Sequence, residues 1–99
     1  MKTIFFPSNY KKALLEKKKT MTIRVKAEIG KYKKGQIYMV KSYAGSDWGV
    51  NVRILDINLT NLKNLSHLGI PKRSIESIQR KEKINKNSRV ELLKFEIVK

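Results

Sequence analysis

The sequence predicts a small α+β domain, built as a partly open β-barrel of about five mainly antiparallel strands with two or three short helices. Its 99 residues suit one domain with one core, over residues 1–99. Five runs are rich in β-branched and aromatic residues, as strands are. The segments between these runs contain glycine, proline or lysine, and three of them have apolar residues at helical spacing.

The first half of the chain contains three expected strands and one helix. Pro7 ends the first strand, and Ser8 or Asn9 then caps a helix that continues to about Lys18. A basic loop is expected between the second and third strands, at 28–35. The three strands are expected at 1–6, 20–26 and 36–43.

The second half contains two expected strands and two helices. The alternating run 48–58 forms a hairpin with the preceding strand around the turn 44–47. Short helices are expected at 60–66 and after Ile70-Pro71, where Ile75 and Ile78 would be buried. The last strand is expected at 89–98, and a change in its apolar phase predicts a bulge near Leu92.

The charge balance predicts a polyanionic partner. The chain has 23 lysine and arginine residues against 8 acidic ones, a net charge of +15. Ion-pair networks need both signs, so a surface of paired charges does not account for this excess. Nucleic acid is the leading candidate, and an anionic membrane surface is the weaker one because no basic amphipathic helix with bulky apolar anchors is present.

Other function classes are disfavoured by composition. The chain has no cysteine and one histidine, so we expect no metal site and no cofactor. No apolar run approaches the roughly 18 residues that would span a bilayer. The N-terminal residues lack the apolar segment of a secretory signal, so we expect a cytoplasmic protein.

The second expected strand has an unusual polar face. Its apolar residues alternate with Thr20, Thr22 and Arg24, which we expect to face solvent beside Lys18 and Lys19. Two hydroxyls and a guanidinium in a row can hold an anionic ligand. The alternatives are an ordinary surface strand, since threonine favours strands, and an ion pair between Arg24 and a nearby acid such as Glu28.

Aromatic residues accompany the basic ones in two places. Tyr32 lies within the basic loop and is expected to be exposed. Tyr43 and Trp48 flank the expected turn, where exposed rings would stack on unpaired bases. A tryptophan at the head of an alternating apolar face is more often a core residue, so both interpretations of Trp48 stay open.

The order of strand, helix, Lys19-Thr20-x-Thr22-x-Arg24 and then Gly35-x-x-Tyr38 resembles the ASCH domain family, small relatives of the PUA-like β-barrels. The resemblance covers roughly residues 3–97. It implies a PUA-like barrel that binds nucleic acid, RNA more readily than DNA, in a basic cleft. The expected contacts are Lys18, Lys19, Thr20, Thr22, Arg24, Lys31, Lys33 and Lys34.

The resemblance also implies an enzymatic alternative, because some stand-alone ASCH proteins are amidohydrolases that act on N4-acetylcytidine and another has been described as a ribonuclease. Lys19 and Thr22 match the lysine and threonine of the amidohydrolase site, with Thr22 as nucleophile and Lys19 as base. The third residue, a glutamate shortly after a histidine, has no match after His67. Glu76 and Glu82 lie further along the chain.

Overall fold

The computed structural model describes residues 2–98 and contains five strands, two α-helices and three 3-10 helices. The chain divides into two compact units. The first unit comprises the described parts of 1–22, 32–57 and 93–99, and the second comprises 23–31 and 58–92. Each unit is therefore built from segments far apart in sequence, and we describe each by itself. The single domain expected from chain length stays a prediction.

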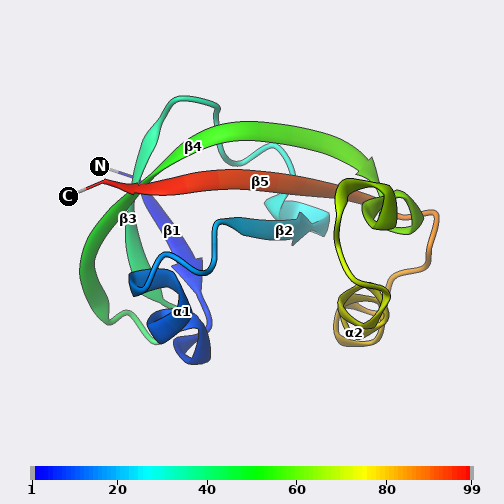
Figure 1. Ribbon diagram of the computed structural model, residues 1–99, viewed down its shortest axis with the longest axis horizontal. Helices are drawn as coiled ribbons and strands as arrows, with labels where there is room; N and C mark the ends of the chain where they lie inside the picture. The colour runs from blue at the N-terminus through cyan, green and yellow to red at the C-terminus, as the bar shows by residue number, and fades with distance from the viewer. Residues whose placement is uncertain (1, 99) are drawn as a thin grey trace. The chain divides into compact units, whose positions relative to one another are not determined.

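The five strands form one mixed sheet, which confirms the predicted α+β class and the number of strands. The order across the sheet is β1-β3-β4-β5-β2. In Figure 1, β5 follows β4 over much of its length. The strands are β1 (Thr3–Phe6), β2 (Met21–Val25), β3 (Ile37–Ser42), β4 (Asp47–Asn61) and β5 (Arg89–Val98).

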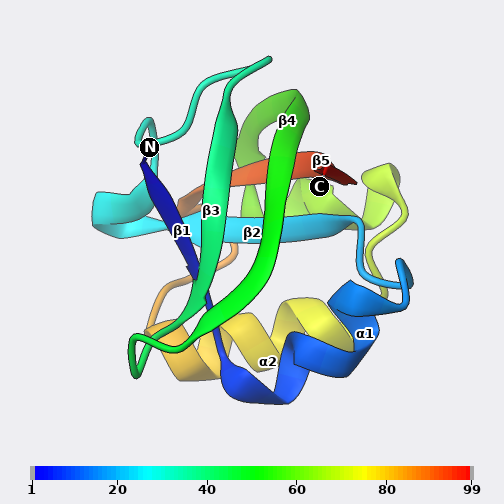
Figure 2. The ribbon, with the colours of Figure 1, turned by 90° about the vertical axis from the view of Figure 1, so that its left-hand side faces the viewer.

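In the first unit, β1 and β3 run parallel to each other (Figure 2). Ile4 lies opposite Val40 in this pair. The expected hairpin is present, since β3 and β4 are antiparallel, with Tyr38 opposite Val52. Side chains alternate between buried and partly exposed along β1 and β3, as a strand with one buried face requires. Their buried residues join one core, which consists of Ile4, Phe6, Leu14, Tyr32, Tyr38, Val40, Trp48, Val52, Ile54, Leu93 and Phe95.

The helix expected from Ser8 to about Lys18 is shorter than predicted. It is divided into a 3-10 helix, η1 (Ser8–Tyr10), and α1 (Lys11–Leu15). Lys17 has a φ of 62°, in the left-handed region, where a right-handed helix does not continue. The chain therefore leaves the helix before Lys18.

The second unit contains η2 (Lys26–Glu28), η3 (Leu62–Leu68) and α2 (Lys72–Glu82). The helix expected at 60–66 begins later because β4 continues to Asn61, and it ends where Gly69 adopts a φ of 89°. Pro71 precedes α2, as expected for a residue without a backbone N–H. Ile75 is buried and Ile78 is half-buried. The buried apolar residues of this unit are Val25, Leu62, Leu65, Ile70, Ile75, Val90 and Leu92.

The burial pattern of β5 changes phase where the apolar pattern of the sequence does, and the bulge expected near Leu92 stays a prediction. All residues from Val90 to Leu93 are buried, and the strand then alternates, with Phe95 buried and Lys94 and Glu96 exposed. The change coincides with the passage of the chain from the second unit to the first, between Leu92 and Leu93. Within residues 2–98, no helix is both long enough and apolar enough to cross a membrane.

Candidate nucleic-acid interface

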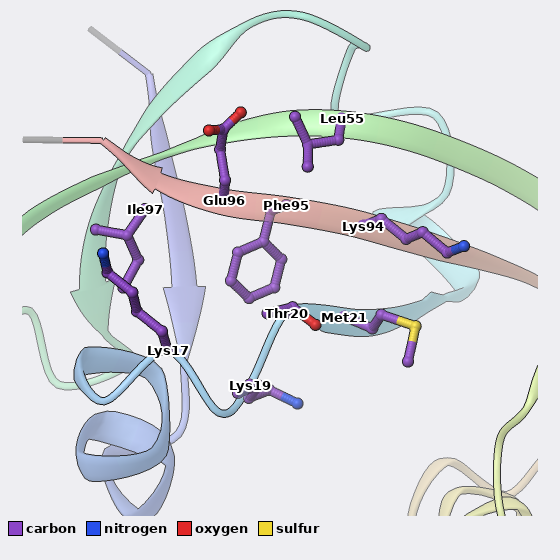
Figure 3. Close-up of a pocket in the computed structure, with 9 residues that line it drawn as sticks. All are labelled: Lys17, Lys19, Thr20, Met21, Leu55, Lys94, Phe95, Glu96 and Ile97. Carbon is purple, nitrogen blue, oxygen red and sulfur yellow. The ribbon is translucent and has the colours of Figure 1, made fainter.

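The first unit contains a pocket of about 560 Å³. Three segments line it: the chain that leads into β2, one residue of β4, and the C-terminal half of β5 (Figure 3). Part of it comes from the Lys19-Thr20 motif that the sequence singled out. The lining residues are Lys17, Lys19, Thr20, Met21, Leu55, Lys94, Phe95, Glu96 and Ile97.

Backbone hydrogen bonds hold the segment between α1 and β2 in place. The N–H of Lys17 donates to the carbonyl of Leu14, and the N–H groups of Lys18 and Lys19 donate to that of Ala13, at 2.8 and 3.1 Å. These bonds satisfy carbonyls at the end of α1, as a left-handed residue after a helix commonly does. The chain therefore turns sharply, and Lys17 and Lys19 both line the pocket.

A further backbone bond joins the two main walls of the pocket. The N–H of Phe95 in β5 donates to the carbonyl of Thr20, at 2.9 Å. The Phe95 ring extends from β5 toward Thr20 (Figure 3) and is only 2% exposed. It packs against Phe6, with 5.7 Å between ring centroids. The wall formed by β5 is therefore anchored in the core of this unit.

Much of the pocket surface is apolar and still reachable by solvent. Met21 and Ile97 are half-buried, and the side chain of Leu55 is 44% exposed. A half-exposed leucine alone needs no explanation, since folded proteins expose much apolar surface. Together, however, these three side chains, with the buried Phe95 ring behind them, give the pocket a wall that can contact a flat, weakly polar group.

Three lysines supply positive charge around this wall. Lys17 and Lys94 are exposed, and Lys19 is half-buried. The Lys19 Nζ lies 4.3 Å from the centroid of the Tyr10 ring, a cation–π contact that restricts the side chain. In Figure 3, Lys19 and Lys94 extend toward the same side of the pocket, away from Glu96. The arrangement can hold an anion on that side.

Glu96 is the acidic residue of the pocket lining. Its Oε2 lies 4.0 Å from Nη1 of Arg53, and both side chains are nearly half exposed. Such a pair contributes little to stability because water screens it. Lys17, Lys94 and Glu96 were missed in the sequence analysis. The signal for the last two was the polar face of the final strand, where they flank the apolar Phe95.

The solvent-facing row expected from Thr20, Thr22 and Arg24 is wrong for two of its members. Thr20 is exposed, but Thr22 is 8% and Arg24 4% exposed. The Nη1 of Arg24 lies 3.8 Å from Oε1 of Glu28, so the ion-pair alternative is the one that the structure contains. A buried guanidinium needs a carboxylate nearby, and Glu28 provides it four residues along the chain. The strand alternates as predicted, but its polar face is the better buried one.

The basic loop also differs from expectation at its aromatic residue. Tyr32 is 3% exposed rather than exposed, and its ring meets that of Tyr38 edge-on at 5.1 Å. Lys31, Lys33 and Lys34 remain exposed. Burial removes the apolar surface of the tyrosine ring from water, which stabilises the folded chain. The charged ends of the neighbouring lysines stay in water.

Several predicted cationic residues have acidic neighbours. Lys18 lies 3.4 Å from Glu16, Lys31 3.0 Å from Glu28, and Lys34 3.9 Å from Asp56. The lysines of these pairs are all more than half exposed, so the pairs are weak and leave the lysines accessible.

The two aromatic residues near the turn behave differently. Trp48 is 7% exposed and packs against Phe6, with ring centroids 6.2 Å apart, so it is a core residue. Tyr43 is 62% exposed, and its ring stacks on Phe5 at 5.9 Å.

The second unit contains a buried carboxylate that the sequence analysis missed. Glu91 is 5% exposed, and its Oε2 accepts a hydrogen bond from the N–H of Gly30 at 3.1 Å. Its Oε1 has no hydrogen-bond partner among the described residues. The signal was an acid between apolar neighbours in the final strand.

The two glutamates considered for the enzymatic alternative lie on α2, where Glu76 is exposed and Glu82 is half-buried. No cluster of three potential metal-ligating side chains occurs among residues 2–98.

Two solved structures resemble this chain. The crystal structure of the hypothetical protein PH0355 matches it with a TM-score of 0.72 over 99% of this chain and all of that one, at 15% sequence identity. The ASCH domain from Lactobacillus crispatus JV V101 matches with a TM-score of 0.59 over 88% of this chain and 69% of that one, at 10% identity.

The chain has an ASCH-like fold. This confirms the fold that the Lys19-Thr20-x-Thr22-x-Arg24 resemblance implied. No protein-family model matches the sequence, and no curated protein matches it. Likeness at such low identity establishes the ASCH-like fold alone, so the activity has to be argued from the pocket and the charge of the chain.

Proposed function

We propose that this protein binds nucleic acid, RNA in preference to DNA, in the cytoplasm. The observation that carries the proposal is the pocket of the first unit, where three lysines surround an apolar wall in a chain of net charge +15. The ASCH-like fold supports it, because the resemblance implies PUA-like relatives that bind RNA.

The distribution of acids supports a polyanionic ligand. The chain has only eight acidic side chains but 23 basic ones. Glu96, the acid in the pocket lining, already lies beside Arg53. Phosphate groups would therefore supply the negative charge that the chain lacks, and each phosphate contact would release bound counterions from the nucleic acid.

We assign the direct contacts to exposed or half-exposed side chains. Lys17, Lys19 and Lys94 would contact phosphates at the pocket, and the hydroxyl of Thr20 would donate to a phosphate or a base. Among the residues first expected, Thr22 and Arg24 are buried, so we propose that they support the strand from within. The remaining proposed contacts are Lys18, Lys31, Lys33 and Lys34.

The test compares two variants that lose the same charge. Lys17, Lys19 and Lys94 change to glutamine in the first, and the exposed Lys63, Lys81 and Lys86 of the second unit change to glutamine in the control. Fluorescence anisotropy then measures binding of a labelled single-stranded RNA of about ten nucleotides. We expect the pocket variant to bind at least about tenfold more weakly. Its log–log salt slope should shrink by about 2, because each neutralised phosphate of a single strand contributes about −0.7.

Two results would count against this assignment. An equal loss in both variants would mean that overall charge, and not the pocket, determines binding. A wild-type protein that binds neither RNA nor DNA at low salt would refute the proposed function itself. A matched DNA strand tests the preference for RNA, since the 2′-hydroxyl distinguishes the two.

The amidohydrolase alternative has one observation in its favour: Lys19, the hydroxyl of Thr20 and the carboxylate of Glu96 line the same pocket. The proposed nucleophile Thr22, however, is only 8% exposed and does not line it. Incubation of the pure protein with N4-acetylcytidine, followed by chromatography, tests this alternative. Release of cytidine that Lys19→Ala abolishes would favour the enzyme, and separate Thr20→Val and Thr22→Val variants would identify the nucleophile. No release, with RNA binding intact, favours the binding protein.

A further inference from the structure

We propose that the pocket of the first unit receives one unpaired nucleotide, with its base against the apolar wall and its phosphate on the lysines. This inference rests on the proposed function and specifies it: the ligand is single-stranded, and one nucleotide leaves the strand to enter the protein. The pocket is formed by the start of β2, Leu55 of β4 and the C-terminal half of β5, and neither Thr22 nor Arg24 lines it.

The size of the pocket fits a small organic ligand. Its volume of about 560 Å³ lies within the range of roughly 300–1,000 Å³ that is usual for small-molecule sites. A base within a duplex is stacked on both faces and paired at its edge, so it cannot enter such a site. An unpaired base has a free face, and contact between that face and protein side chains is the common way to bind single strands.

The lining chemistry selects a ligand with two different parts. A free phosphate would contact the lysines but would leave Met21, Leu55 and Ile97 against water. A neutral apolar molecule would cover these side chains but would gain nothing from the three lysines. A nucleotide satisfies both, because it joins a flat base to an anion.

The carboxylate of Glu96 restricts how the nucleotide would lie. Phosphate would avoid it, and Figure 3 shows Lys19 and Lys94 extending away from it. We therefore place the phosphate on the side of these two lysines. Phe95 forms the back of the pocket and is held there by Phe6 and by the hydrogen bond to Thr20, so the wall is preformed.

A matched pair of leucines on one strand tests the inference. Leu55 lines the pocket and is 44% exposed, and Leu59, four residues further along β4, is 50% exposed and is not a lining residue. Leu55→Asp and Leu59→Asp change the net charge equally. We expect Leu55→Asp to weaken binding of the single-stranded RNA at least about tenfold, because it places a carboxylate at the bound nucleotide. Leu59→Asp places its carboxylate elsewhere, so we expect it to weaken binding less than about twofold. Circular dichroism checks that both variants fold, and Leu55→Ala and Leu59→Ala replace them if one does not.

A second measurement tests the base separately from the phosphate. Adenosine 5′-monophosphate and ribose 5-phosphate are titrated into the wild-type protein, and amide shifts are followed by NMR. We expect the nucleotide to bind more tightly and to shift the amides of Thr20, Met21 and residues 94–97 most. Equal affinity for both compounds, or shifts elsewhere, would overturn the pocket assignment.

The outcomes separate this inference from the proposed function. RNA binding that is equally strong in the Leu55 and Leu59 variants overturns the nucleotide pocket and leaves RNA binding standing. If the wild-type protein does not bind RNA but does bind adenosine 5′-monophosphate in the pocket, the proposed function is overturned and the pocket is a site for free nucleotides.

Discussion

At the scale of single residues, Tyr38 joins the core of the first unit to the basic loop. Its ring is buried, with 1% exposure, and meets the Tyr32 ring edge-on. Its Oη accepts a hydrogen bond from the backbone N–H of Lys33 at 2.8 Å. One side chain therefore anchors the part of the basic loop that lies in the first unit and carries Lys33 and Lys34.

Tyr38→Phe tests this anchor. The ring stays, but the N–H of Lys33 loses its acceptor, so we expect the free energy of unfolding to fall by about 0.5–1.5 kcal/mol. Chemical denaturation measures the loss, and amide exchange at Lys33 should become faster. The control is Tyr43→Phe, which removes the same hydroxyl from a ring that is 62% exposed and should change stability little. Equal stability of both variants would show that the hydrogen bond does not anchor the loop.

The wrong expectations for single residues concern which side chains are exposed, because exposure depends on contacts with distant or oppositely charged residues. The strand periodicity itself was predicted correctly. The alternation of Thr20, Thr22 and Arg24 correctly described β2 as a strand, but it gave no information on which face is covered. Arg24 is buried beside Glu28, although a charged residue alone indicates exposure. Whether a buried charge has a partner depends on the fold, and the i,i+4 spacing of Arg24 and Glu28 was the only local sign of it.

At the scale of elements, strands were predicted better than helices. All five strands appear near the expected positions, because period-two alternation and turn residues are local features. The first helix ends early because Lys17 takes a left-handed conformation, which composition does not reveal in a lysine. The segment expected as a helix at 60–66 begins as strand, since the pairing of β4 continues past the point where the pattern weakens.

Only the part of the candidate site that comes from one short segment could be predicted, because the sequence shows local patterns and not long-range pairing. Lys19 and Thr20 were identified from a compact motif, within seven residues. Lys94 and Glu96 come from the opposite end of the chain, and their place beside Thr20 follows from the hydrogen bond between Phe95 and Thr20. Long-range pairing between the second and last strands is a property of the sheet order, which sequence patterns alone do not specify.

At the scale of the whole molecule, the net charge of +15 affects stability as well as binding. Like charges on a folded chain of 99 residues lie closer together than on the unfolded chain, so their repulsion opposes folding. Salt screens this repulsion, because the Debye length falls from about 30 Å at 0.01 M to about 10 Å at 0.1 M. The same screening weakens attachment of a polyanion. Salt should therefore act on stability and on RNA affinity with opposite signs.

We accordingly expect the melting temperature to rise by a few degrees between about 10 and 150 mM sodium chloride, while RNA affinity falls over the same range. A shift of this size corresponds to roughly 1 kcal/mol for a domain of this length. The Lys63, Lys81 and Lys86 glutamine variant is the control: with three fewer positive charges, it should melt at a higher temperature at low salt and respond less to added salt. Differential scanning calorimetry measures both. A melting temperature that falls with salt, or a control that responds as strongly as the wild type, would mean that charge repulsion does not limit the stability of this fold.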